Sequence, residues 1–149
     1  MPVSQTSRAT GVFLFASLLP IVAHAADLAT SIVGTRYGIG QPSNPNMLWL
    51  EQWRPDGSVT IKTRLCLGTT AVDHQSTGRW RVSGQQEFIV FDEPNGSQTK
   101  DTYEVVFEKG SVLREVMTES NRINPPLQFV WHSTKVADDF EFPTCNPIS

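Results

Sequence analysis

Apolar and polar residues alternate along much of this chain, most regularly between Met47 and Leu67. Two alternating runs in this stretch are joined by Arg54-Pro55-Asp56-Gly57. Pro55 fixes φ at the first corner of a type I turn, and Gly57 can adopt the left-handed conformation that closes it. The pattern therefore predicts a β-hairpin with a three-residue loop and a G1 bulge.

The loop length also predicts how the two strands pair. It sets Trp53 opposite Val59, Glu51 opposite Ile61 and Trp49 opposite Thr63. One face of the hairpin is then apolar and aromatic, and Glu51 lies on it between two tryptophans. A four-residue loop would shift the pairing by one residue and set both tryptophans against polar side chains, so we exclude it.

Further short strands are predicted at regular spacing along the chain. They lie at 34–38, 78–82, 87–91, 102–108, 111–118 and 127–132, on either side of the central hairpin. A helical turn over 28–32, capped by Asp27, precedes them, and residues 68–77 and 119–126 are predicted to be loops. An antiparallel meander of about eight strands closes most simply as an up-and-down barrel, so we expect an all-β fold.

The first 25 residues have the features of a secretory signal peptide. Arg8 supplies a positive charge, an apolar run follows at 11–19, and Ala23-His24-Ala25 matches a cleavage site. The apolar run is shorter than the roughly 20 residues that span a bilayer. We therefore expect a periplasmic or secreted protein, whose single domain comprises residues 26–149 with no membrane span after signal removal.

The charge pattern argues against nucleic acid as a partner. Loss of Arg8 with the signal leaves 11 basic and 15 acidic residues, a net charge near −4. No run or stripe of Lys and Arg is present, whereas such a stripe is the electrostatic footprint of nucleic-acid binding.

The two cysteines, Cys66 and Cys145, are predicted to form a disulfide, because the expected compartment is oxidising. Cys66 lies on the outer face of the hairpin, so the bridge would hold the C-terminal tail against the outside of the sheet. Closing this loop is worth on the order of 3–4 kcal/mol in the chain-entropy model. The alternatives are free thiols or a metal site, but neither cysteine has a second Cys or His at ligand spacing.

Three segments resemble small bacterial lipocalin-like proteins of the calycin group. They are Gly34-Thr35-Arg36-Tyr37, the hairpin turn from Trp53 to Ser58, and Gly78-Arg79-Trp80-Arg81-Val82. The resemblance covers most of the predicted mature chain. It implies an eight-stranded barrel, open at one end, that often holds a small apolar ligand. Arg36 stands where the family has its first tryptophan, and we expect it to stack on Trp131 of the last strand.

The inward face of such a barrel would carry the candidate ligand-binding residues. These are Arg36, Trp49, Glu51, Trp53, Trp80, Tyr103, Phe129 and Trp131. A buried Glu51 must be paired or protonated, so it could anchor a ligand, act as an acid or base, or form an ion pair with Arg36. Alternatively, it lies in contact with water at the barrel mouth. The rings could line a pocket or simply fill the barrel, because eight strands leave room for packed side chains or for one small ligand.

Recognised catalytic motifs are absent from the sequence, including G-x-S-x-G, H-E-x-x-H and a glycine-rich phosphate loop. The leading hypothesis is a non-enzymatic exported binding protein for a small apolar or amphipathic ligand, a lipid included, with no cofactor. A protein-binding inhibitor or immunity-type module that uses residues 68–77 and 119–126 is the alternative. An enzyme centred on Glu51 and Arg36 is a distant third.

Overall fold

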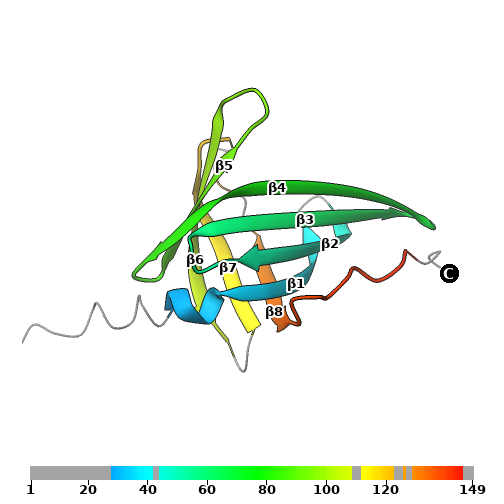
Figure 1. The fold of residues 1–149 in the computed structure, drawn as a ribbon, viewed down its shortest axis with the longest axis horizontal. Coiled ribbons are helices and arrows are strands. Elements are labelled where there is room, and N and C mark those ends of the chain that lie inside the picture. The colour runs from blue at the N-terminus through cyan, green and yellow to red at the C-terminus, as the bar shows by residue number, and fades with distance from the viewer. Residues whose placement is uncertain (1–27, 42–43, 109–111, 123–125, 127–128, 146–149) are drawn as a thin grey trace, which may run out of the picture.

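Eight antiparallel strands form a closed barrel in a computed structural model of the chain, and each strand pairs with its neighbours in chain order (Figure 1). The structure describes residues 28–41, 44–108, 112–122, 126 and 129–145. The strands are β1 (Gly34–Gln41), β2 (Asn44–Trp53), β3 (Ser58–Leu67), β4 (Thr70–Ser83), β5 (Gln86–Asp92), β6 (Gln98–Phe107), β7 (Val112–Ser120) and β8 (Val130–Val136). The last strand pairs with the first, which closes the wall. The predicted up-and-down barrel is confirmed.

The central hairpin has the predicted register. β2 and β3 pair Trp53 with Val59, Glu51 with Ile61 and Trp49 with Thr63. Gly57 has a φ of 82°, and its N–H donates to the carbonyl of Arg54 at 3.1 Å. The turn at residues 54–57 therefore sets a register in which Trp49, Glu51 and Trp53 of β2 point into the barrel, where all three are buried.

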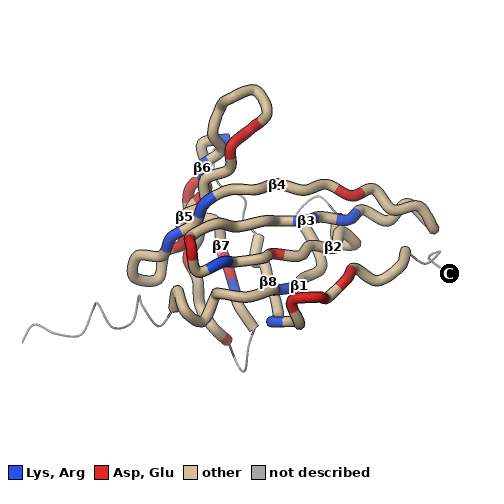
Figure 2. The backbone as a smooth tube through the Cα atoms, viewed as in Figure 1, with Lys and Arg blue, Asp and Glu red and all other residues tan. Residues whose placement is uncertain are grey.

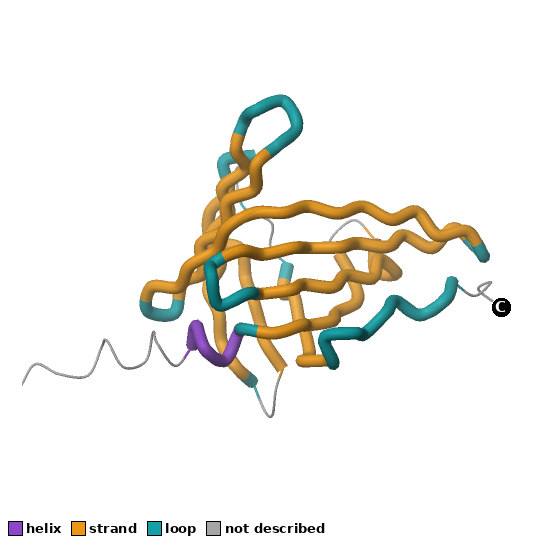
Figure 3. Tube along the Cα trace, in the orientation of Figure 1, coloured by secondary structure: helices purple, strands orange, loops and turns teal. Residues whose placement is uncertain are grey.

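One end of the barrel is packed with apolar side chains. The helix formed by residues 28–32 lies at this closed end (Figure 3), and Trp53 packs edge-on against Trp80 with ring centroids 5.3 Å apart. The buried cluster comprises Ile32, Trp53, Val59, Ile89, Phe91, Val105 and Leu113. Burying each such side chain stabilises the fold by about 1.5–3 kcal/mol, so these residues form the main core.

Gly38 of β1 allows the Trp49 ring to lie across the inner face of that strand. A Cβ atom at position 38 would collide with the indole. The indole Nε1 donates a hydrogen bond to the carbonyl of Gly40 at 3.1 Å. The absence of a side chain at Gly38 and this hydrogen bond together fix the orientation of Trp49.

The predicted loop at 68–77 is wrong. Residues 70–77 belong to β4, which pairs with β3 as far as Leu67 and Thr70, so the connection is a short turn at Gly68 and Thr69. Both strands extend well beyond β2 in Figure 1, and we call residues 65–73 the hairpin arm. Residues 70–75 are exposed on both faces, so this part of the strand has no apolar alternation to reveal it.

The observed bounds of other strands differ from the predicted ones by a few residues. β8 runs from Val130 to Val136, whereas residues 127–132 were predicted. Within the predicted loop 119–126, residues 119 and 120 still belong to β7. The rest of that prediction is tested only in part, because residues 123–125 lie outside the described residues, as do Asp27 and the predicted signal peptide at 1–25.

The C-terminal tail, residues 137–145, runs back along the outside of the barrel (Figure 1). The predicted disulfide between Cys66 and Cys145 is present, with Cα atoms 5.4 Å apart. The ring of Phe140 also packs against Tyr37 of β1, with centroids 5.0 Å apart. The tail is therefore held to the outer face of the sheet by both a covalent and an aromatic contact.

Candidate functional site

A cavity of about 180 Å³ lies inside the barrel, towards the end opposite the helix. Gln41, at the end of β1, and Arg122, just after β7, both border it. The full lining is Gln41, Trp49, Glu51, Ile61, Ile89, Tyr103, Glu115, Met117, Arg122 and Trp131. We call this space the mouth cavity.

Aromatic rings form much of the wall of the mouth cavity, and their orientations are fixed. Tyr103 and Trp131 meet edge-on, with centroids 5.8 Å apart and an interplanar angle of 84°. Phe129 packs against the other side of this cluster, 4.9 Å from Trp131. The Trp131 Nε1 donates to Gln41 Oε1 at 3.2 Å, as Trp49 donates to Gly40. Because both indole N–H groups are used, neither indole offers a free donor to the cavity.

Two buried carboxyls complete the wall, and a third lies near them. Glu51 is 6% exposed and Glu115 is 4% exposed, while Glu87 is fully buried without bordering the cavity. All three point inward because each occupies an apolar-face position of its strand, as Glu115 does between Leu113 and Met117. The Trp53 Nε1 donates to Glu51 Oε2 at 3.1 Å.

Burial changes the acidity of these groups. Desolvation raises the pKa of Glu51 and of Glu115 well above the ordinary value, and raises the pKa of Glu87 to about 8. The charge of Glu87 raises the pKa of Glu115 further, and the charge of Glu51 raises the pKa of Glu87. The oxygens of Glu87 have no hydrogen-bond partner among the described residues. Groups with such shifts inside a cavity are typical of functional sites.

Arg36 supplies positive charge beside these carboxyls. It pairs with Glu51 in the register of β1 and β2, is fully buried, and lowers the pKa of each of the three acids. Its Nε donates to Ser133 Oγ at 3.1 Å, and its Nη2 donates to the Ser133 carbonyl at 3.2 Å. The guanidinium lies 5.3 Å from the centroid of Phe107. The expected stacking on Trp131 is therefore wrong, and Phe107 takes that place.

The structure divides the predicted ligand-binding residues into two groups. Trp49, Glu51, Tyr103 and Trp131 border the mouth cavity. Phe129 supports Trp131, and Arg36 lies beside the acids. Trp53 and Trp80 instead pack at the closed end, where the Trp80 Nε1 donates to the carbonyl of Arg54 at 3.1 Å. These two rings contribute to the core rather than to the cavity wall.

Sequence reasoning missed Glu87 and Glu115. Both residues alternate with buried apolar neighbours, as Glu87 does with Ile89 and Phe91. The same pattern that singled out Glu51 could therefore have found them, because an acid on the apolar face of a strand faces the core.

Asp101 and Arg122 form a separate charged pair at the rim. Arg122 Nη2 lies 3.2 Å from Asp101 Oδ2, and Ser120 donates to the other carboxylate oxygen at 2.6 Å. Throughout the described ranges, no group of three or more His, Cys, Asp or Glu side chains is placed to hold a metal ion.

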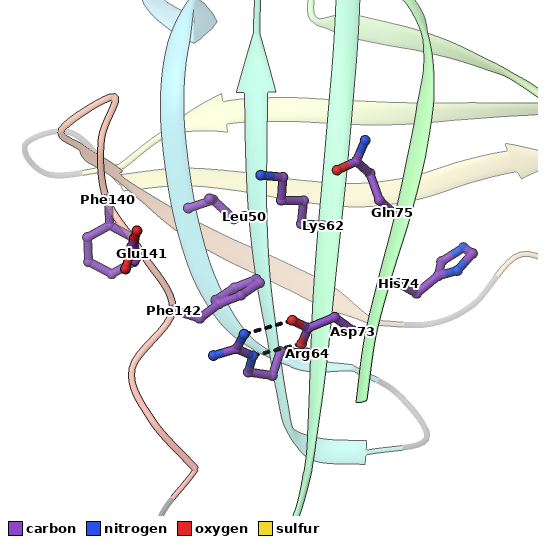
Figure 4. Close-up of a pocket in the computed structure, with 9 residues that line it drawn as sticks. All are labelled: Leu50, Lys62, Arg64, Asp73, His74, Gln75, Phe140, Glu141 and Phe142. Atoms are coloured by element: carbon purple, nitrogen blue, oxygen red, sulfur yellow. Dashed lines mark hydrogen bonds and ion pairs between the residues drawn. The ribbon is translucent and has the colours of Figure 1, made fainter. Parts of the chain in front are cut away.

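A larger hollow of about 500 Å³ lies outside the barrel, between the tail and strands β2 to β4 (Figure 4). Its centre is the ion pair of Arg64 with Asp73, at 2.7 Å, and Phe142 lies 5.1 Å from the Arg64 guanidinium. This hollow is an open groove on the surface, and no buried acid or base faces into it. The mouth cavity lies inside the barrel and is bordered by buried ionisable groups, so we take it as the candidate site.

Comparison of the chain with protein-family models, with curated proteins and with solved structures finds no match. No helix in the described part of the chain is long and apolar enough to cross a membrane. Lys and Arg residues occur singly around the barrel and not in one stripe (Figure 2). The function is therefore inferred from the geometry of the mouth cavity.

Proposed function

We propose that this protein is a non-enzymatic binding protein that takes a small amphipathic ligand in the mouth cavity. The observation that carries the proposal is a cavity with rigid aromatic walls and two buried carboxyls, inside a barrel whose other end is packed. Apolar walls with a few placed polar groups are the usual composition of a small-molecule site.

The size of the cavity restricts the ligand. Typical small-molecule pockets occupy roughly 300–1,000 Å³, whereas this one measures about 180 Å³. An apolar cavity of about 150 Å³ is large enough for benzene. We therefore expect a ligand with one ring and a short polar arm, and not an enclosed lipid chain.

The disulfide between Cys66 and Cys145 fits a periplasmic or extracellular protein. We propose that residues 1–25 direct export and that residues 26–149 form a lipocalin-like ligand-binding domain. N-terminal sequencing of the exported protein would test this part, and a chain that still begins at Met1 would contradict it.

Filling the cavity tests the proposed function. Met117→Trp and Ile61→Trp each add a large ring to the cavity wall, while Leu67→Trp places the same ring on the exposed hairpin arm. Binding of phenethyl alcohol and phenethylamine is measured by calorimetry on folded protein, as judged by circular dichroism. We expect at least one probe to bind the wild type and the control, and binding to fall about ten-fold or more in the filled variants. Absence of binding to the wild type, or equal binding to all folded variants, would overturn the proposal.

The hairpin arm supports a second candidate, a protein-binding module. Leu67 is 59% exposed and Val72 is 50% exposed near its tip, and exposed apolar side chains on a projecting hairpin are suited to a protein contact. Substituting both by Ser would abolish co-purification of a specific partner if this candidate holds. Co-purification that is unchanged, or absent from the wild type, would argue against it.

A further inference from the structure

The charges inside the barrel do not balance. Three buried acids lie near one another, namely Glu51, Glu87 and Glu115, while Arg36 is the cation that acts on all three. If every acid were ionised, this group would carry a net charge of about −2. A buried unpaired carboxylate is strongly disfavoured, so the remaining acids must hold protons or meet another cation.

The remaining charges at the rim do not correct this imbalance. Arg122 borders the cavity, but it is paired with Asp101, whose side chain is 2% exposed. Burial raises the pKa of Tyr103, the other titratable group on the wall, well above its ordinary value, so its hydroxyl stays neutral. The interior keeps its excess of acids, and two of them, Glu51 and Glu115, border the empty space.

The aromatic wall, like the acids, favours a cationic ligand. Trp49, Tyr103 and Trp131 surround the cavity, and the faces of such rings attract cations by about 0.5–2 kcal/mol each. The indole N–H groups, which could have bound an anion, already donate to Gly40 and Gln41. Both the rings and the carboxyls therefore favour a cation, because an acid that releases its proton to make room for the ligand then carries a negative charge beside it.

We infer that the ligand of the mouth cavity is a small organic cation, a protonated amine or a quaternary ammonium attached to one ring. This inference rests on the proposed function. The cationic group lies against Glu51 and Glu115 and takes the place of a proton, while the ring of the ligand packs among Trp49, Tyr103 and Trp131. An anion of the same size would be repelled by either acid in its ionised form, and a neutral molecule has no charge with which to replace the proton.

Three probes of nearly equal size test whether the cavity prefers a cation, a neutral molecule or an anion. Phenethylamine is a cation at neutral pH, phenethyl alcohol is neutral and phenylacetate is an anion. Binding to the wild type is measured by calorimetry at pH 7, in buffers of different ionisation enthalpy. We expect the amine to bind about ten-fold or more tightly than the alcohol, the anion not to bind, and binding of the amine to release close to one proton.

Substitution of one acid tests whether the preference for the amine arises in the mouth cavity. Glu115→Gln keeps the shape of the side chain and removes its charge, while Glu119→Gln makes the same change on the exposed part of β7. We expect Glu115→Gln to weaken binding of the amine about ten-fold and to leave binding of the alcohol within about two-fold. Glu119→Gln should change neither. Glu51→Gln serves as a second variant if Glu115→Gln does not fold.

The outcomes separate this inference from the proposed function. If the alcohol binds as tightly as the amine, or if neither folded Gln variant weakens binding of the amine, the cation inference is wrong. The proposed function then still stands on the binding of the alcohol and its loss from the cavity-filled variants. If neither the amine nor the alcohol binds the wild type, both are wrong.

Discussion

Glu87 of β5 and Glu115 of β7 lie close enough inside the barrel for the charge of Glu87 to raise the pKa of Glu115, although β6 separates their strands. The first side chain is fully buried and the second is 4% exposed. Two buried carboxyls this close to each other cannot both be ionised without a large cost, so the folded protein keeps a proton here that an unfolded chain would have released by neutral pH.

This proton makes stability depend on pH. Burial raises the pKa of Glu87 from 4.5 to about 8, so the folded state binds more protons than the unfolded state between those values. The free energy of unfolding therefore falls as pH rises through that window, by at most about 1.4 kcal/mol per pH unit for each extra proton. Urea denaturation at pH 5, 6, 7 and 8 measures the slope. Constant or increasing stability across this range would contradict the prediction.

Glu87→Gln should reduce the slope of the free energy of unfolding against pH by the contribution of one proton. The amide resembles the protonated acid, so we expect stability close to that of the wild type at pH 5 and about 1–3 kcal/mol higher at pH 8. Glu104→Gln, on the exposed face of β6, serves as the control and should leave the slope unchanged. A slope that is the same in all three proteins would show that Glu87 does not hold the proton.

Arg36→Met should destabilise the barrel more at high pH than at low pH. The change removes the hydrogen bonds to Ser133 and the cation that lowers the pKa of the three acids. At pH 5 the acids are protonated and the loss is mainly that of hydrogen bonds, about 1–3 kcal/mol. At pH 8 the unpaired charges increase the loss to about 3–5 kcal/mol. The same urea denaturation series measures the loss of stability at each pH. An equal loss at pH 5 and pH 8 would contradict the prediction.

The parts of the fold that the sequence predicts are those fixed by local chemistry. Pro55 and Gly57 determine the turn and therefore the register of β2 and β3, which is why the pairing of Glu51 with Ile61 could be predicted. The hairpin arm could not be predicted in the same way, because residues 70–75 are exposed on both faces and the apolar pattern is lost.

The candidate site could be predicted only in part for a different reason. Alternation tells which side chains face inward, but it does not tell at what depth they lie. Depth depends on the tilt and stagger of the strands around the barrel. Trp49 and Trp53 share one face of β2, yet the first borders the cavity and the second packs in the core. The same stagger brings Glu87 and Glu115 together from strands that are not neighbours.

Loss of the disulfide should release the tail. Replacing both Cys66 and Cys145 by Ser removes a cross-link between residues 79 positions apart, and we expect a loss of about 2–4 kcal/mol in the free energy of unfolding. Limited proteolysis should then cleave residues 137–145 earlier than in the wild type. Binding of phenethylamine should stay within about two-fold, because the tail lies outside the barrel. A tail that is equally resistant to proteolysis in both proteins would show that the contact between Tyr37 and Phe140 is sufficient to hold it.

Gly38→Ala should disturb the mouth cavity through Trp49. The new methyl group collides with the indole and lies close to the carbonyl of His132, and overpacking of this kind costs about 1–3 kcal/mol. Because the displaced ring forms part of the cavity wall, we also expect binding of phenethylamine to weaken. Gly68→Ala is the matched control: nothing lies within 4 Å of its Cβ position, so it tests the backbone cost of a φ of 64° without a clash.

A second substitution separates this collision from a general loss of stability. Trp49→Phe removes the part of the ring that the methyl group would meet, so the double variant Gly38→Ala with Trp49→Phe should lose less stability than the sum of the two single variants. Urea denaturation of the four proteins gives this coupling energy. If the effects add, Trp49 does not depend on the missing side chain of Gly38. A loss smaller than the sum would mean that β1 is built around this ring, and that Gly38 helps to position the wall of the ligand site.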